Sequence, residues 1–287
     1  MYNILISIII LILLLIYTKL FNIKKETFLN KNDIPVYISV TSIFKNQREL
    51  YLTLKSILSQ SQQPNKIYVY LSEEPYILDD GFKNKQITYI NLKNLLNDNK
   101  IFEIKFVENT GSYRKLLPIL KKKWDEECII ITIDDDTIYD ENLIQNLVND
   151  YKKYNCVINY RGFTPDMDKL EDFEHNRRSS IKSRSLYNFP LGKGGILYTP
   201  QFFKKTGNLI FNYEIYSNTC DKQDDIWFYI IRMLNGVDCY LNKNKKWVKK
   251  DISTDGLWKN FNKKNNSNTV AYHKTLKKIK QLYPQYF

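Results

Sequence analysis

Three consecutive carboxylates follow an uninterrupted apolar run near the middle of the chain. Residues 128–133 read Cys-Ile-Ile-Ile-Thr-Ile, and Asp134, Asp135 and Asp136 follow directly. Such a run predicts a strand buried on both faces, as in a parallel α/β sheet. Ligands of these sheets bind beyond the carboxyl ends of the strands. Because adjacent carboxylates raise one another's pKa, we expect a partner here, and a divalent cation that also holds a phosphate is the simplest one.

A second acidic pair and a glycine cluster lie further along the chain. Asp224 and Asp225 open a segment with helical spacing of apolar residues, and Gly192-Lys-Gly-Gly195 precedes them. Each feature has an ordinary structural explanation: the pair fits a helix N-terminus, the cluster fits a tight turn, and the triplet fits an acidic turn before a helix capped by Asp140. Glycines also let a backbone approach a ligand, and this cluster lies between two acidic sites. The combination therefore favours one composite site.

The elements that would position these residues alternate between strand-like and helix-like patterns. We predict strands at residues 36–40, 66–71, 102–106 and 128–133, and helices at 46–60, around 116–120, after Asp140 and from Asp224 to Gly236. This alternation predicts an α/β fold with a mostly parallel, Rossmann-like sheet. Residues 161–188 are polar and irregular, which is typical of functional loops. We expect this segment and the tail, residues 243–287, to shape the acceptor site.

The order of these motifs resembles that of nucleotide-sugar-dependent glycosyltransferases of the GT-A fold, near the family-2-like enzymes. The resemblance covers most of residues 35–240 and includes Ser39-Val-Thr-Ser42, Leu52–Gln60 and Gly111-Ser-Tyr-Arg-Lys115-Leu-Leu, besides the acidic and glycine motifs. It implies a single GT-A catalytic domain. It also implies that Asp134-x-Asp136 is the DxD motif, in which Asp136 ligates Mn²⁺ or Mg²⁺, Asp134 contacts the metal or the ribose, and Asp135 belongs to the donor site.

The same resemblance assigns further roles on the donor side. Thr41 and Ser42 would face the nucleotide base, and Lys115 would lie at the donor site. Asp225 holds the position of the Asp in the family's Glu-Asp motif and is the expected catalytic base. Asp224 stands where that motif has Glu, so the two roles could be exchanged.

On the acceptor or sugar side, the expected contacts are Gly194, Gly195 and Trp227. The rings of Trp227 and Tyr198 offer flat faces to a sugar, although both also fit core aromatics.

The predicted activity is metal-dependent transfer of a hexose or N-acetylhexosamine from a UDP- or GDP-sugar to a hydroxyl of a glycan, lipid or protein. A cation stabilises the charge of the departing diphosphate, and a hydroxyl acceptor needs a carboxylate base, which predicts inversion. Two alternatives stay open. One is a non-catalytic, membrane-tethered protein that binds nucleotide sugars or glycans on the same fold. The other is a nucleotidyltransferase or metal phosphoesterase, which would lack its usual glycine-rich phosphate loop.

The N-terminus predicts a membrane anchor. Residues 4–17 are almost all Ile or Leu, and no small-residue cleavage site follows. We therefore expect a signal-anchor helix at residues 1–23, a linker at 24–33 and a catalytic domain at 34–287. Three lysines after the apolar run favour a cytosolic location for the catalytic domain by the positive-inside rule. A lumenal location of this domain remains an alternative.

Composition narrows the remaining function classes. Lys and Arg number 43 against 31 Asp and Glu, for a net charge of +12. The basic residues are scattered and accompany no nucleic-acid recognition motif, so we expect no nucleic-acid partner. Cys128 and Cys156 lie in apolar runs typical of buried thiols, whereas the state of Cys220 and Cys239 is undecided.

Overall fold

The computed structural model describes residues 34–253 and 267–287. The predicted anchor, residues 1–23, and the predicted linker, residues 24–33, lie outside this part. Within the described ranges, no helix combines the length and apolar character needed to cross a bilayer. The chain divides after Ile34, and Pro35–Phe287 form one unit with its own core.

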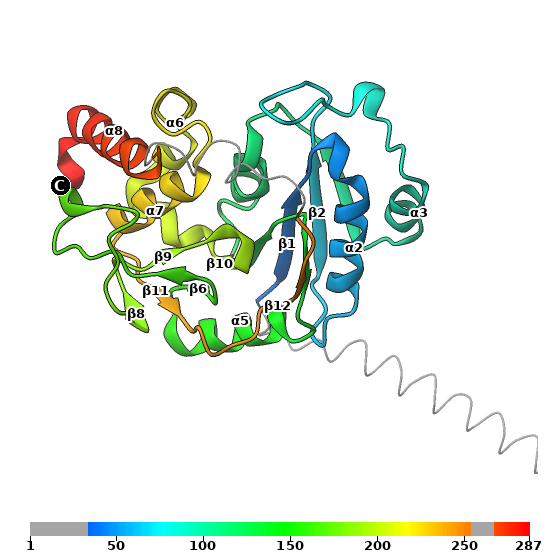
Figure 1. Cartoon of the computed structure of the whole chain (residues 1–287), viewed down its shortest axis with the longest axis horizontal. Coiled ribbons are helices and arrows are strands. Elements are labelled where there is room, and N and C mark those ends of the chain that lie inside the picture. Colours follow the sequence, from blue (N-terminus) through cyan, green and yellow to red (C-terminus); the bar gives the residue numbers. More distant parts are fainter. Residues whose placement is uncertain (1–33, 254–266) are drawn as a thin grey trace, which may run out of the picture. The chain divides into compact units, whose positions relative to one another are not determined.

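Eight strands of the described residues form a mixed sheet at the centre of this unit (Figure 1). In spatial order they are β3 (Phe102–Phe106), β2 (Lys66–Leu71), β1 (Val36–Thr41), β4 (Ile129–Ile133), β10 (Ile196–Tyr198), β6 (Val157–Asn159), β11 (Cys239–Leu241) and β8 (Arg184–Ser185). The first four run parallel, and β6 and β11 run parallel to each other. β10 and β8 run antiparallel to their neighbours. The predicted α/β class with a mostly parallel sheet is confirmed. The reversal at β10 was not predicted, because a three-residue strand carries no pattern that reveals its direction.

Helices cover both faces of this sheet. They are α2 (Gln47–Leu58), α3 (Ile90–Asp98), α4 (Leu117–Lys122), α5 (Leu143–Tyr154), α6 (Tyr213–Thr219), α7 (Asp224–Leu234) and α8 (Ser267–Leu282). In Figure 1, α2 and α3 lie beside β1 and β2, whereas α6, α7 and α8 gather over the half of the sheet that contains β10, β6 and β11. Short 3₁₀ segments include Phe44–Asn46, Gly111–Lys115, Gly192–Gly194 and Pro200–Phe211.

Alternation of side chains along the strands builds a separate apolar layer on each face. Tyr68, Tyr70 and Ile130 join the core cluster that includes the buried residues of α4, α7 and α8. Their neighbours along β2 and β4, such as Val69 and Ile131, are equally buried and point to the opposite face. Burial on both faces explains why these strands read as continuous apolar runs in the sequence.

Two small antiparallel pairs complete the unit, and one of them matters for the site. β7 (Gly162–Phe163) pairs with β9 (Phe189–Pro190), and β12 (Val248–Asp251) pairs with β5 (Thr137–Tyr139). Asp251 lies opposite Thr137, and the N–H of Ile252 donates to the carbonyl of Asp136 at 3.1 Å. The tail thus returns to the acidic triplet.

Two local expectations are settled at this level. Asp140 is not the N-cap of α5, because that position is held by Asn142. Asp140 lies two residues earlier, and its Oδ1 accepts from the N–H of Asn142 at 3.1 Å. Cys220 and Cys239 are free, buried thiols, as are Cys128 and Cys156.

Candidate active site

The acidic triplet lies where two adjacent parallel strands end. Val40 of β1 pairs with Ile133 of β4, so the residues that follow both strands meet at the same edge of the sheet. Ser42 Oγ donates a hydrogen bond to Asp135 Oδ2, and Asn46 Nδ2 donates to the same oxygen at 3.2 Å. Burial, reinforced by the charge of Asp136, raises the pKa of Asp135 to about 7. Asp135 therefore ties the triplet to the loop after β1.

Asp134 and Asp136 have different partners from the residue between them. Asp134 Oδ1 lies 3.2 Å from Lys115 Nζ, and Asp136 Oδ1 lies 3.4 Å from Lys193 Nζ. Their side chains stay 31% and 17% exposed, so both carboxylates are accessible to a small ligand. Burial and then the charge of Asp134 raise the pKa of Asp136, while Lys193 opposes this shift.

One buried lysine joins the triplet to the second acidic pair. Lys115 Nζ lies 3.2 Å from Asp134 Oδ1, 3.0 Å from Asp224 Oδ2 and 4.0 Å from Asp225 Oδ1. Burial by itself lowers the pKa of Lys115, but these three carboxylates outweigh it and hold the pKa well above its usual value. The ammonium is therefore charged, and residues about 110 positions apart in the sequence share one centre.

Gly192 allows this centre to form. A Cβ at this position would lie 2.6 Å from Lys115 Nζ, 3.0 Å from Asp225 Oδ1 and 3.6 Å from Asp134 Oδ1. Its N–H also donates to Asp225 Oδ2 at 3.2 Å. The close approach of the glycine backbone, expected from the sequence, thus occurs at Gly192.

The next glycines of the cluster pack against the scaffold. A Cβ on Gly194 would lie 2.6 Å from Arg161 Cβ, and Gly195 has a φ of +74° and faces Leu143. Both glycines are buried. Their expected role in sugar or acceptor binding stays a prediction. Any such contact would involve their backbone atoms, because protein atoms rather than open space lie where a Cβ would be.

The two carboxylates at the start of α7 are bound differently. Asp224 Oδ1 accepts from Ser112 Oγ at 2.7 Å, and its Oδ2 pairs with Lys115. Asp225 Oδ1 is buried and accepts no hydrogen bond from the described residues, although the side chain as a whole is 27% exposed. Burial raises the pKa of Asp225 to about 7, Lys115 lowers it and the charge of Asp224 raises it. Asp225 is thus the more distant of the two carboxylates from Lys115, and it has a pKa near neutrality.

A fully buried tyrosine links the triplet to the glycine segment, and sequence reasoning missed it. The Tyr139 hydroxyl accepts from the N–H of Asp134 at 2.9 Å and donates to the carbonyl of Lys193 at 3.2 Å. Tyr139 is 1% exposed. Its position on β5, directly after the triplet, was the only available signal.

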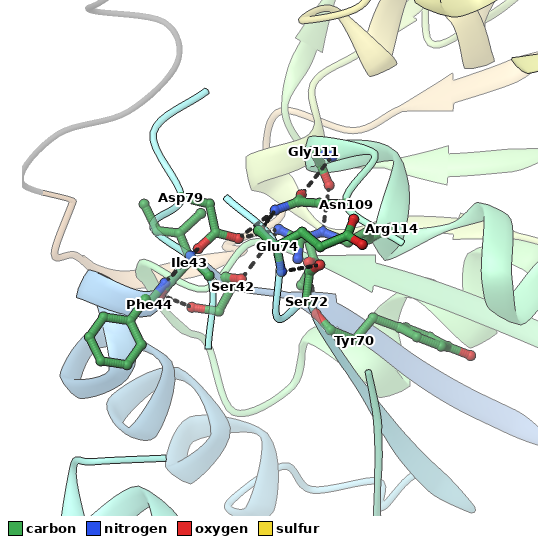
Figure 2. A network of polar contacts seen from close by, with 12 residues as sticks. Ser42, Ile43, Phe44, Tyr70, Ser72, Glu74, Asp79, Asn109, Gly111 and Arg114 are labelled. Atoms are coloured by element: carbon green, nitrogen blue, oxygen red, sulfur yellow. Dashed lines mark hydrogen bonds and ion pairs between the residues drawn. The ribbon is translucent and has the colours of Figure 1, made fainter. Parts of the chain in front are cut away.

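A polar network beside the triplet was also missed (Figure 2). Asp79 accepts from the N–H of Phe44 at 2.9 Å, from Asn109 Nδ2 at 3.2 Å and from Arg114 Nη2 at 2.9 Å. Asp79 thereby fixes the loop after β1 relative to the segment Gly111–Lys115. Arg114 is 1% exposed, and its Nη1 has no hydrogen-bond partner among the described residues.

Three predicted contacts lie further from the cluster of charges. Thr41 Oγ1 donates to the carbonyl of Tyr70 on the neighbouring strand at 2.8 Å. Trp227 is fully buried and donates from Nε1 to the carbonyl of Ile210 at 2.8 Å, and Tyr198 is 2% exposed. Because neither ring has an open face, the structure places both aromatics in the core and corrects the expectation that Trp227 stacks on a sugar.

The charge balance of the site suits a divalent cation. In the described part of the chain, six carboxyl groups gather there and outnumber the two ammonium groups of Lys115 and Lys193; the carboxyl groups are those of Asp134, Asp135, Asp136, Asp224, Asp225 and Asp251. Among the described residues, no group of three or more His, Cys, Asp or Glu side chains is arranged to enclose a metal. Two hard carboxylates with phosphate oxygens completing the shell is a usual arrangement for Mg²⁺. Asp134 and Asp136 fit that arrangement.

No protein-family model and no curated protein matches the chain. Among solved structures, a crystal structure of S. aureus TarS is similar over 75% of this chain and 36% of its own length, at 14% identity and a TM-score of 0.48. S. aureus TarS 1–349 in complex with UDP-GlcNAc is similar over 78% of this chain and 60% of its own, at 14% identity and 0.48. The Francisella tularensis 2-C-methyl-D-erythritol 4-phosphate cytidylyltransferase IspD is similar over 77% of this chain and 94% of its own length, at 12% identity and a TM-score of 0.45. The chain thus spans about a third of the first of these proteins.

Proposed function

We propose that this chain is a glycosyltransferase that uses a nucleotide-sugar donor and transfers the sugar to a hydroxyl group. The observation that carries the proposal is the single buried lysine, Lys115, between two acidic motifs with different chemistry. One motif offers accessible carboxylates for a cation and a diphosphate. The other offers a partly exposed carboxylate with a pKa of about 7, a value that suits a general base.

On the donor side, Asp134 and Asp136 would hold Mn²⁺ or Mg²⁺. A bound cation supplies charge stabilisation to the departing diphosphate. Without such a cation, the excess of carboxylates over ammonium groups would repel a diphosphate. Lys115 adds a fixed positive charge at the junction, and Ser42 keeps the loop after β1 against Asp135.

On the acceptor side, the partly exposed carboxylate of Asp225 would take the proton from the attacking hydroxyl. The N–H of Gly192 donates to Asp225 Oδ2 and orients this carboxylate. Asp224 is occupied by Ser112 and Lys115 and would position that lysine. A base opposite the leaving group corresponds to inversion at the anomeric carbon.

A donor screen on the full-length chain tests the proposal. We expect one of the common UDP- or GDP-sugars to bind calorimetrically with Mn²⁺ and to release intact nucleoside diphosphate. Asp136→Ala should abolish the metal-dependent part of this binding. Asp225→Asn should keep binding and reduce turnover about 10²-fold or more.

Three other outcomes separate the alternatives. Binding without turnover by the wild type would indicate a non-catalytic nucleotide-sugar-binding protein. Release of pyrophosphate would indicate nucleotidyl transfer. If no nucleotide sugar binds in the presence of Mn²⁺ or Mg²⁺, the proposal fails.

We also propose that residues 1–23 anchor the protein to a membrane, on the strength of the Ile- and Leu-rich run alone. Fractionation of the full-length chain should recover it with membranes after an alkaline carbonate wash. Recovery in the soluble fraction would contradict the anchor. Protease protection of intact vesicles would report the side on which the catalytic unit lies.

A further inference from the structure

Lys193 lies between the triplet and the tail, in a place that the proposed function leaves unexplained. Its Nζ is 3.4 Å from Asp136 Oδ1 and 2.8 Å from Asp251 Oδ1, and its side chain is 16% exposed. Asp136 is one of the two carboxylates proposed to hold the divalent cation. Lys193 therefore already neutralises an oxygen that the cation would need.

The backbone around Lys193 keeps it in this position. Its carbonyl accepts from the fully buried Tyr139, and it is flanked by Gly192, which packs against Lys115, and by Gly194, which packs against Arg161. These contacts hold the backbone of Lys193 beside the site, while its side chain keeps its own rotatable bonds.

Asp251 contacts Lys193 from the other side, with a side chain that is 54% exposed. β12 pairs with β5 next to the triplet, and the N–H and hydroxyl of Ser253 donate to Asp251 Oδ1 at 3.0 and 2.8 Å. Although partial burial opposes it, the contacts with Lys193 and Ser253 lower the pKa of Asp251 to about 2. Asp251 is therefore a permanently charged second acceptor for the ammonium of Lys193.

From this geometry we propose that Lys193 is a built-in counter-ion of Asp136, and that a divalent cation binding at Asp134 and Asp136 displaces it from this carboxylate. On displacement, the ammonium stays on Asp251, its closer partner. Lys193 lowers the affinity of the site for a free divalent cation, and Asp251 limits this competition. The inference depends on the proposed cation site at Asp134 and Asp136.

The competition predicts opposite effects on metal affinity for the two partners. Mn²⁺ binding to the full-length protein, measured by the loss of the free-ion EPR signal without nucleotide, should be about tenfold tighter in Lys193→Met, or about 1.4 kcal/mol. It should be several-fold weaker in Asp251→Asn, because Lys193 then has only Asp136. Lys250→Met removes an exposed lysine from the same strand and should leave the affinity unchanged.

The double variant separates competition from direct ligation. In Lys193→Met, the further change Asp251→Asn should weaken Mn²⁺ binding less than it does in the wild type, because the competitor is gone and only the charge of Asp251 near Asp136 is lost. An equal or larger weakening in this double variant would make Asp251 a metal ligand and overturn its role as acceptor. Unchanged or weaker binding in Lys193→Met, with normal wild-type binding, would overturn the counter-ion role alone. No Mn²⁺ binding by any variant would reject both this inference and the proposed metal site.

Discussion

The pH dependence of turnover should respond to the charge on Lys115 in a way that its distance to Asp225 predicts. If Asp225 is the base, kcat/KM rises with pH through its pKa of about 7 and falls about tenfold per pH unit below it. Lys115→Met removes a positive charge 4.0 Å from Asp225 Oδ1. Loss of that charge favours the protonated carboxyl, so the pKa of Asp225 should rise and the acid limb should move to higher pH.

The size of the shift lies between two limits. Two unit charges 4 Å apart interact by about 4 kcal/mol at the effective dielectric constant near a protein surface and by about 1 kcal/mol in water. At about 1.36 kcal/mol per pKa unit, these limits correspond to about three units and somewhat less than one unit. Because the Asp225 side chain is 27% exposed, solvent screening favours the lower half of this range, about one to two units.

The assay is kcat/KM for donor turnover from pH 5.5 to 9.5 with Mg²⁺, after thermal melting has shown that each variant is folded. The position of the acid limb is compared rather than the rate itself, since Lys115 also contacts Asp134. Asp224→Asn should move the limb to lower pH, because the Asp224 carboxylate raises the pKa of Asp225. An acid limb that stays in place in Lys115→Met, or that rises in Asp224→Asn, would refute Asp225 as the base.

Three further variants test how the site is held together. The pKa of Asp135 is about 7 in the folded protein, against about 3.9 in an unfolded chain. The folded state therefore binds this proton more tightly, and the stability that the proton contributes is full at low pH and is lost as the pH rises towards 7. Asp135→Asn, which stays neutral and still accepts from Ser42, should therefore raise the free energy of unfolding at pH 8 by about 1–3 kcal/mol and change it little at pH 4, measured with urea and without metal. Tyr139→Phe leaves the N–H of Asp134 and a carbonyl without their partner and should cost about 1–3 kcal/mol in the same assay; an unchanged value would show that neither bond matters. Gly192→Ala places a Cβ 2.6 Å from Lys115 Nζ and should reduce kcat about 10- to 100-fold with little change in melting temperature, whereas normal kcat would show that the lysine can shift freely.

Local patterns predicted the scaffold well because burial in this sheet follows the sequence directly. The strands Lys66–Leu71 and Phe102–Phe106 have the predicted bounds, and the apolar run before the triplet ends at Ile133 as expected. Both faces of β4 are covered, so its residues had to be apolar, and the first polar residue marks the edge of the sheet. The parallel pairing of β1 with β4, which the sequence did not predict, brings Ser42 and Asp135 to one edge.

The contacts of the site could not be predicted to the same extent, because they join segments with no shared local pattern. Asp251 lies on a strand of four residues, Val-Lys-Lys-Asp, whose exposed side chains give no strand-like alternation. Asp79 lies near the exposed acidic residues Glu73, Glu74 and Asp80 in the sequence. No local pattern shows that Asp79 alone among them is buried and paired with Arg114. The position of Trp227 could not be predicted for a different reason: an aromatic ring beside an acidic pair has the same sequence pattern whether it faces a ligand or the core.

The arrangement around Lys115 couples the two halves of the proposed reaction. The ammonium holds Asp134 at 3.2 Å and lowers the pKa of Asp225 from 4.0 Å, so the donor side and the base share one positive charge. As a diphosphate departs, its growing negative charge would attract that ammonium away from Asp225. The pKa of Asp225 would then rise while the acceptor hydroxyl loses its proton, which makes the carboxylate a stronger base when it is needed. A lysine with a single carboxylate partner could not produce this coupling, which gives a physical reason for burying one cation between two acidic motifs.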